Sequence, residues 1–499
     1  MKIKTLIFAL AVFTACSQSI SAEPKSVASS QTIETIQESP QDHQIHDEAH
    51  AGLEEQGPPV WSVIPFILLL LLIATGPLFF EHFWHRFYPL IAISLAAIVV
   101  LFYIIFLKNV SNPIHAGFEY FQFICLLASL YIASGGIWIN VDKKATPGIN
   151  VAFLAIGAIV SNLIGTTGAS MLLIRPFMRI NAGRIKPYHV VFFIFIVSNL
   201  GGSLTPIGDP PLFLGFLKGV PFFWTVQHNF LPWIFAITIL CSIFYFIDKR
   251  NGFGDLHSPE NLEYTGKVAL MGKRNFIWLG VVIVAVFLDP NVFEWVPGIE
   301  YHGQKFSFIR ELIMLSVAYF SHRFASKKAL EENEFSFGPI KEVAYIFIGI
   351  FGTMMPALEL VGIFAQSPTG TALINHNTLY WGTGALSSFL DNAPTYLNFL
   401  AAGMASKGAS INQLADVRQF AAGGFPDSVL MLTSISIASV FFGAMTYIGN
   451  GPNFMVKAIS EERGIAMPSF FGYMAKYSIP ILLPLLIIVW ATFFAFQSV

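Results

Sequence analysis

Two aspartates of this sequence lie in long apolar stretches, next to residues that interrupt helices. Asp209 directly precedes Pro210, and Asp391 lies three residues before Pro394. An ionisable side chain inside a membrane is costly, and by default it marks an ion or proton path. A carboxylate that is partly removed from water can exchange a proton for a metal cation near neutral pH. Both acids could also cap helices, a role that is compatible with ion binding.

The segment around Asp209 is repeated in the second half of the chain. Residues 202–213 read Gly-Ser-Leu-Thr-Pro-Ile-Gly-Asp-Pro-Pro-Leu-Phe, and residues 443–454 read Gly-Ala-Met-Thr-Tyr-Ile-Gly-Asn-Gly-Pro-Asn-Phe. Six of the twelve positions are identical, so that Asp209 aligns with its near-isostere Asn450. Each segment follows a long apolar stretch and begins a shorter one.

A polar segment that contains Gly or Pro precedes each repeat. Residues 161–168 read Ser-Asn-Leu-Ile-Gly-Thr-Thr-Gly, and residues 387–395 read Ser-Ser-Phe-Leu-Asp-Asn-Ala-Pro-Thr. Breaks at corresponding places of two inverted halves are the best sequence indication of a transporter binding site. The breaks and the segments before them add these polar candidates: Asn162, Thr166, Thr205, Asn392, Thr395 and Thr446.

The residue types of these segments have a physical reason. Gly and Pro stop a helix within the membrane and leave backbone N–H and C=O groups without intrahelical partners. Such groups are tolerated at membrane depth only where they line a cavity or are buried in protein. Hydroxyl and amide side chains complete an oxygen-rich cage there, and helix ends add dipole charge. We predict a site for a small ion, an anion or both; kinks that serve packing alone are the alternative.

The composition is that of a membrane protein. Of the 499 residues 55% are hydrophobic and 12% are charged, whereas a soluble protein has about 25% charged residues. Apolar runs recur from residue 61 to the C-terminus, and a spanning helix needs roughly 20 mostly apolar residues. We therefore predict an all-α integral membrane protein that has the lipid bilayer as its partner. The net charge of −2 gives no indication of nucleic-acid binding.

Hydrophobicity predicts single spans as well as interrupted segments. Two hairpins that do not cross the membrane are expected at 149–179 and 377–404, and two broken helices at 187–218 and 428–462. The expected single spans are 62–80, 88–107, 119–139, 230–247, 275–289, 307–321, 342–361 and 477–496.

The distribution of Lys and Arg supports the two hairpins. If both return to the side that they entered from, the basic loops gather on the cytoplasmic side. Treating either hairpin as a span would invert every later loop. The halves 61–247 and 275–499, joined by a cytoplasmic linker at 248–274, are thus predicted to be inverted-topology repeats. Each repeat has a re-entrant hairpin and a broken transmembrane helix.

The N-terminal region is predicted to be an export signal followed by a tail. Residues 1–22 have two lysines and a short apolar stretch. Cleavage after Ala22 is favoured over cleavage before a lipidated Cys16. Residues 23–60 have the composition of a disordered tail, and we assign no metal site to its histidines. The tail is therefore expected in the periplasm, and the protein in the bacterial inner membrane.

Other features point away from enzymes. No Walker loop, nucleophile elbow or His-Glu-x-x-His motif is present, and three scattered cysteines form no disulfide framework. We expect a gradient-driven transporter that is not an enzyme and uses no cofactor. A channel or a non-transporting scaffold is the remaining alternative.

Four further charged residues are candidates for other roles: Arg310 and Glu311 as a pair, Arg175 as an anchor at the membrane surface, and Glu359 as a weaker site residue.

Together these motifs resemble the ion transporter superfamily, which includes NhaD-type sodium/proton antiporters, arsenite permeases and citrate or dicarboxylate carriers. The resemblance covers residues 61–496. In sodium-coupled dicarboxylate carriers both hairpin tips carry Ser-Asn-Thr, whereas here Leu163 follows Asn162 and the second hairpin carries Asp391-Asn392-Ala393. An extra carboxylate would repel a di- or tricarboxylate unless a cation intervenes. The resemblance therefore ranks sodium/proton antiport first and transport of citrate or a dicarboxylate second, and it implies a homodimer.

The resulting hypothesis has two sites, one at Asp391 and one at Asp209, and each binds sodium or a proton. The hairpin-bearing halves rock and thereby expose the sites alternately. The site at Asp391 includes Asn392 and Thr395 of the second hairpin and Thr446 of the second broken helix. The site at Asp209 includes Asn162, Thr166 and Thr205, and Asn450 stands at the position that aligns with Asp209.

Overall fold

The computed structural model describes residues 57–141, 145–251, 268–293, 295–301 and 304–497. The predicted signal peptide, nearly all of the tail and most of the 248–274 linker lie outside the described residues. The chain divides into a unit that ends at Ser62 and a unit that covers Val63–Val499. Apart from the short 3-10 helix η1 (Val60–Val63), all elements and sites discussed below belong to the second unit.

Helices make up most of the described chain, and eight of those in the described residues are long and apolar enough to cross a membrane, or up to nine if a bent pair is one span. This confirms a multi-pass, predominantly helical membrane protein. In the first half the helices are α2 (Ile64–Phe79), α3 (Glu81–Ile105), α4 (Ser111–Gly135), α5 (Pro147–Ile180), α6 (Pro187–Ile196), η2 (Leu200–Leu204), α7 (Pro210–Lys218) and α8 (Trp224–Arg250). A short turn, η1 (Val60–Val63), precedes them.

The second half has more and shorter helices. They are α9 (Lys273–Val286), α10 (Ile309–Arg323), α11 (Lys327–Glu332), α12 (Gly338–Thr353), α13 (Met355–Gln366), α14 (Pro368–Leu373), α15 (His376–Ser387), α16 (Asn392–Ala405), α17 (Leu414–Ala421), α18 (Ser428–Phe441), η3 (Phe442–Met445), α19 (Gly451–Glu462), α20 (Phe470–Tyr473), a π-helical segment η4 (Met474–Leu482) and α21 (Leu483–Phe493).

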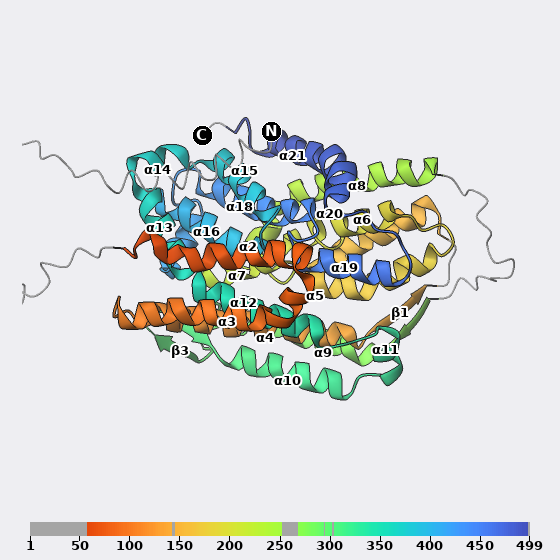
Figure 1. Cartoon of the computed structure of the whole chain (residues 1–499), viewed down its shortest axis with the longest axis horizontal. Coiled ribbons are helices and arrows are strands. Elements are labelled where there is room, and N and C mark those ends of the chain that lie inside the picture. Colours follow the sequence, from red (N-terminus) through yellow and green to blue (C-terminus); the bar gives the residue numbers. More distant parts are fainter. Residues whose placement is uncertain (1–56, 142–144, 252–267, 294, 302–303, 498–499) are drawn as a thin grey trace, which may run out of the picture. The chain divides into compact units, whose positions relative to one another are not determined.

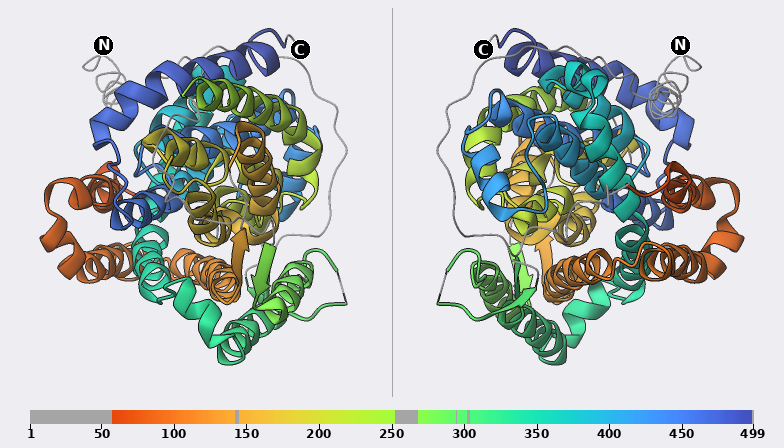
Figure 2. Two further views of the ribbon diagram at one scale, coloured as in Figure 1. Left: turned by 90° about the vertical axis from the view of Figure 1, so that its right-hand side faces the viewer. Right: turned by 90° about the vertical axis from the view of Figure 1, so that its left-hand side faces the viewer.

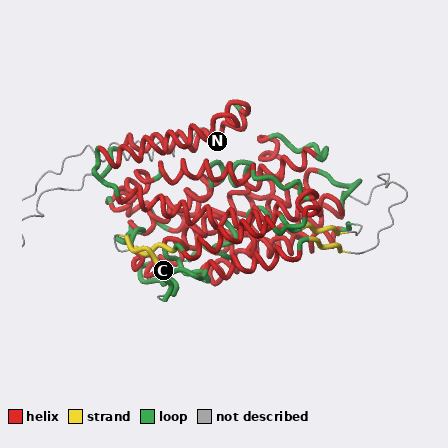
Figure 3. The backbone as a smooth tube through the Cα atoms, turned by 90° about the horizontal axis from the view of Figure 1, so that it is seen from below, coloured by secondary structure: helices red, strands yellow, loops and turns green. Residues whose placement is uncertain are grey.

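Two differences from the predicted elements have clear causes. The expected span 342–361 is bent by 45° between α12 and α13, because Pro356 near the start of α13 lacks the N–H group that would bond back to α12. The sequence also did not predict two antiparallel strand pairs. These are β1 (Trp138–Val141) with β2 (Val268–Met271) and β3 (Gly298–Tyr301) with β4 (Gln304–Ser307). The two pairs lie at opposite ends of the helices (Figure 3).

The helices of the large unit form two groups that pack against each other. One group contains α3, α4, α9, α10 and α12, which contact one another directly. In the other, α7 contacts α16 and α18, α8 contacts α5 and α18, α5 contacts α19, and α15 packs on α16 and α18. Figures 1 and 2 show both groups: α3 and α4 in orange with α9, α10 and α12 in green to teal, and α5, α7 and α8 in yellow to light green with α15, α16 and α18 in teal to blue. The hairpins and breaks that the sequence singled out all lie in the second group.

Helix α5 folds back on itself. At Gly165 the backbone leaves the helical region, with φ 80° and ψ 152°. The side chains of Asn150 and Asn181, near the two ends of α5, exchange two hydrogen bonds of 2.9 Å. A straight helix of 34 residues would hold its ends about 50 Å apart. The chain therefore forms a helical hairpin at the predicted position. Helices α15 and α16 also pack against each other, and they form the second predicted hairpin.

The two predicted breaks have the same local geometry. Thr205 and Thr446 are extended, with φ/ψ of −132°/154° and −140°/168°. Asp209 and Asn450, which immediately precede α7 and α19, have φ/ψ of −143°/142° and −150°/140°. The repeated sequence thus adopts a repeated conformation. The residue that immediately precedes each shorter helix is Asp209 in the first break and its near-isostere Asn450 in the second.

Candidate functional site

The carboxylate of Asp209 lies at the centre of a buried polar site and is 1% exposed. Its Oδ1 accepts hydrogen bonds from Thr166 Oγ1 at 2.7 Å and from Asn450 Nδ2 at 3.1 Å. Its Oδ2 accepts from Asn392 Nδ2 at 2.6 Å. Four elements that are distant in sequence therefore meet at one carboxylate. The sequence-based hypothesis grouped Asn392 with Asp391, whereas its side chain bonds to Asp209.

Four helix N-termini converge on this carboxylate. Thr166 begins the second arm of α5, Asp209 precedes α7, Asn392 begins α16 and Asn450 precedes α19. Each N-terminus carries roughly half a positive charge. Within the described residues no Lys or Arg side chain bonds to Asp209 or to its three donors. The backbone, rather than a basic side chain, makes this site favourable for negative charge.

Two amides that sequence reasoning missed extend the network. Asn199 Oδ1 accepts from Asn450 Nδ2 at 3.2 Å, and Asn199 Nδ2 donates to Asn453 Oδ1 at 2.6 Å. Asn453 Nδ2 in turn donates to the carbonyl of Thr446 at 2.9 Å. Asn453 lies within the second repeated segment, and Asn199 lies just before the first one. An amide at such a position in an apolar stretch is the sequence signal that could have identified both residues.

Three of the predicted site residues hold the broken backbone in place. Asn162 Oδ1 accepts from the N–H of Leu204 at 2.8 Å, and Thr205 Oγ1 donates to the Asn162 carbonyl at 2.6 Å. Thr446 Oγ1 donates likewise to the Ser388 carbonyl at 2.6 Å. These side chains satisfy groups that the helix breaks leave unpaired. They therefore position the site around Asp209 and do not contact its carboxylate.

Asp391 caps helix α16 and also keeps one oxygen free. Its Oδ1 accepts from the N–H of Ala393 at 2.9 Å, and Thr395 Oγ1 donates to its carbonyl at 2.9 Å. No hydrogen bond to Oδ2 is found among the described residues, and Asp391 is half-buried. The cap that was considered from the sequence is present, and it leaves an unpaired carboxylate oxygen one residue from Asn392.

A small cavity borders the site at the tip of the first hairpin. Gly165, Thr166 and Gly208 line it on one side, and Leu130 of α4 and Val343 of α12 line it on the other. Its volume is about 50 Å³, below the ~300–1,000 Å³ that is common for small-molecule sites. The cavity lies between the two helix groups and reaches Thr166, a donor to Asp209.

The other charged candidates have partners elsewhere. Arg310 Nε donates to Glu311 at 2.7 Å, which confirms the predicted pair, and both residues are buried in the protein. The interpretation of Arg175 as a surface anchor is wrong, because Arg175 is buried and pairs with Glu334 at 2.8 Å. Glu359 accepts hydrogen bonds from Tyr103 and Asn112.

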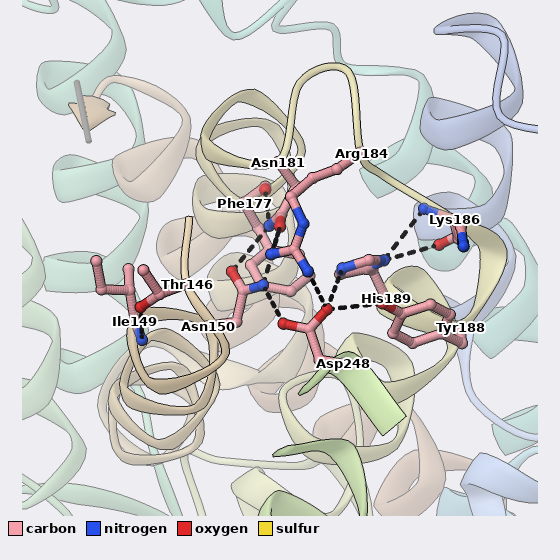
Figure 4. Close-up of polar contacts among 10 residues, drawn as sticks. All are labelled: Thr146, Ile149, Asn150, Phe177, Asn181, Arg184, Lys186, Tyr188, His189 and Asp248. Carbon is pink, nitrogen blue, oxygen red and sulfur yellow. Dashed lines mark hydrogen bonds and ion pairs between the residues drawn. The ribbon is translucent and has the colours of Figure 1, made fainter. Parts of the chain in front are cut away.

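A second buried polar cluster, also missed from the sequence, surrounds Asp248 at the end of α8 (Figure 4). Its carboxylate accepts from Arg184 at 2.5 Å, Tyr188 at 2.7 Å, His189 at 3.1 Å and Asn150 at 3.0 Å. The cluster ties the base of the first hairpin to the start of the first broken helix. Because Asp248 is followed by Lys249 and Arg250, the sequence suggested a solvated end of a span.

The fold and the buried polar site are those of a multi-pass membrane transporter. A family model described as "Putative citrate transport" matches residues 55–494, and the chain belongs to that family. No curated protein matches the chain. The family supports a citrate-transporter-like membrane protein, and it does not single out the NhaD-type antiporters. Of the two functions considered from the sequence, the second is closer to the family.

Proposed function

We propose that the protein is a cation-coupled transporter of citrate or a related di- or tricarboxylate, with sodium or a proton as the coupling ion. The observation that carries the proposal is the meeting of four helix N-termini at a buried carboxylate without a basic side chain. Helix N-termini bind carboxylates through their free N–H groups and dipole. A substrate carboxylate can bind near these N-termini only if the charge of Asp209 is first neutralised.

That requirement provides the coupling. Two like charges about 4 Å apart repel by about 4 kcal/mol at an effective dielectric constant of 20. A cation or a proton at Asp209 removes this repulsion and therefore raises the affinity for the substrate. By linkage the substrate raises the affinity for the cation by the same factor. Asp391, with its unpaired Oδ2, is the second position for a coupling ion.

Alternating access completes the proposal. The matched breaks and the two hairpins support two inverted repeats with re-entrant hairpins. Because the cavity beside Thr166 is small, the hairpin group must move relative to α4 and α12 to admit a carboxylate. In this proposal the protein resides in the inner membrane with its N-terminal tail in the periplasm. A homodimer rests on the superfamily resemblance alone.

Sodium/proton antiport is the second candidate. It is favoured by two acids, Asp209 and Asp391, that have hydroxyl and amide neighbours and no basic partner among the described residues. In that mechanism the cation and the proton compete for the carboxylates, and no organic substrate is needed.

One experiment separates the two candidates. Purified protein in proteoliposomes receives a sodium, lithium or proton gradient, with and without labelled citrate outside. For a citrate transporter we expect citrate to accumulate only with a cation gradient. Sodium-driven pH changes in citrate-free buffer, without citrate accumulation under any gradient, would refute the carboxylate proposal and support antiport. The variant Glu462→Gln, at an exposed position of α19, is the control.

A further inference from the structure

A second cavity lies where three candidate membrane spans end. Its volume is about 480 Å³, within the range of small-molecule sites. Residues from the start of α8, the start of α18 and the end of α21 line it. The apolar spans Trp224–Arg250, Ser428–Met445 and Phe470–Phe493 begin or end at the same places. Where these three candidate spans cross a bilayer, the cavity, called the α18 cavity below, falls at the depth of the lipid headgroups.

The polar wall of the α18 cavity is an uncapped helix N-terminus. Asp427 precedes α18 in the left-handed conformation, with φ 60° and ψ 3°, and its side chain makes no capping bond. Ser428 lines the cavity and is 1% exposed, and its Oγ has no hydrogen-bond partner among the described residues. No backbone acceptor is found there for the N–H groups of Val429 and Leu430. Buried polar groups in native proteins rarely lack partners, so a ligand with acceptor oxygens fits here.

The charges around the cavity indicate a ligand that is both negative and positive. The N-terminus of α18 favours an anion such as a phosphate. Asp427 also lines the cavity, and its carboxylate forms no ion pair with any described residue. A simple anion would therefore meet a negative charge beside its binding groups. A zwitterion with its phosphate at α18 and its cation at Asp427 satisfies both.

The apolar wall continues onto the lipid-facing side of the protein. Leu231, Phe425 and Phe493 line the cavity, and the side chain of Leu231 is 63% exposed. On the same helix α8, Phe230 and Ile234 are also exposed. In a membrane these side chains contact acyl chains. A ligand that enters from this side carries a hydrocarbon tail.

We propose that the α18 cavity binds a phosphoethanolamine lipid. Its phosphate accepts hydrogen bonds from Ser428 Oγ and the free N–H groups of α18, and its ammonium pairs with Asp427. An ammonium group has N–H donors for a carboxylate, whereas a choline headgroup has none. A glycerol headgroup offers no cation. The lipid preference is therefore ethanolamine over choline and glycerol, and it is independent of transport at Asp209.

The test measures lipid binding to delipidated full-length protein by native mass spectrometry. The probes are phosphatidylethanolamine, phosphatidylcholine and phosphatidylglycerol, with glycerophosphoethanolamine as the headgroup without acyl chains. We expect the ethanolamine lipid to bind about fivefold more tightly than the glycerol lipid, as for a partly exposed ion pair. Asp427→Asn should abolish this preference, while the matched control Glu462→Gln keeps it. Ser428→Ala should weaken the binding of the ethanolamine lipid and of the glycerol lipid about fivefold each, because one hydrogen bond to the phosphate is lost.

Three results would overturn the proposal. The first is an unchanged ethanolamine preference in Asp427→Asn. The second is unchanged binding of all lipids in Ser428→Ala, which would place the headgroup elsewhere. The third is binding of glycerophosphoethanolamine as tight as that of the lipid, which would assign the site to a soluble phosphate compound. Thermal unfolding of each variant verifies that the protein is folded before binding is compared.

Discussion

Replacement of Asp209 by Asn is the most direct perturbation of the proposed coupling. The substitution keeps the volume of the side chain but removes its charge and one acceptor oxygen. Thr166, Asn392 and Asn450 all donate to Asp209, so at least one donor loses its acceptor, and a new N–H group faces donors. Hydrogen bonds to charged groups contribute about 1.5–3 kcal/mol and neutral ones about 0.5–1.5. The local network is therefore weakened by about 3 kcal/mol, summed over three bonds.

The larger effect concerns the coupling ion. A cation about 4 Å from a carboxylate is stabilised by about 4 kcal/mol at an effective dielectric constant of 20. Loss of that attraction corresponds to about a thousandfold lower affinity for the cation. Because Asn already removes the repulsion that the cation neutralises, we expect citrate binding by Asp209→Asn to become independent of sodium, while sodium-driven citrate accumulation falls at least about a hundredfold and higher sodium concentrations do not restore it.

The assay is uptake of labelled citrate into proteoliposomes as a function of external sodium. Glu462→Gln removes one exposed negative charge from α19 and should behave as the native protein does. Size-exclusion chromatography and the thermal midpoint verify that Asp209→Asn is folded. Native uptake with an unchanged sodium dependence in Asp209→Asn would refute the assignment of the coupling ion to this carboxylate.

Three further predictions concern the elements that support the site. Gly165→Ala places a side chain in a conformation that costs about 1–3 kcal/mol and should lower citrate uptake; Gly183→Ala, also at φ 80° but in an exposed loop, should not. Asp248→Asn leaves the buried cluster of Figure 4 with uncompensated partners, so the free energy of unfolding should fall by about 3 kcal/mol while the citrate affinity of folded protein stays unchanged. Arg175 donates a hydrogen bond to Glu334 and holds the pKa of that carboxyl below its ordinary value of 4.5. The pair therefore stabilises the protein above that pH and loses its effect as the pH falls below it, so acidification from about pH 6 to 4 should lower the thermal midpoint less in Glu334→Gln than in the native protein.

The features that the sequence predicted well are those that depend on local residue types. Gly and Pro determine where a helix stops, so the breaks at Thr205 and Thr446 and the turn at Gly165 could be placed without knowledge of their neighbours. The repeated segments also predicted repeated geometry, and the backbone angles of the aligned residues agree closely. Secondary structure of this kind is encoded within a few residues.

The partners of the acids could not be predicted, because they depend on contacts between distant segments. Asn392 and Asp209 are 183 residues apart in sequence, and no local pattern indicates which acid an amide will bond to. Adjacency in sequence favoured Asp391 as the partner of Asn392, but Asn392 begins helix α16 and its side chain reaches the other half. Asp248 was missed for a related reason: two basic residues follow it, although its own side chain is buried.

At one aligned position the two hairpin tips carry Gly165 and Asp391, and this difference bears on the role of Asp209 in the proposed mechanism. Gly165 has no side chain, and it lines the cavity that reaches Thr166. At the other tip Asp391 stands in its place and keeps an unpaired oxygen. Thr166 and Asn392, each one residue beyond its tip, donate to opposite oxygens of Asp209. A change of charge at Asp209 therefore alters hydrogen bonds to both tips at once. In the proposed mechanism, a cation at one tip and a substrate carboxylate at the other would thus influence each other through one buried side chain, without direct contact between the two ligands.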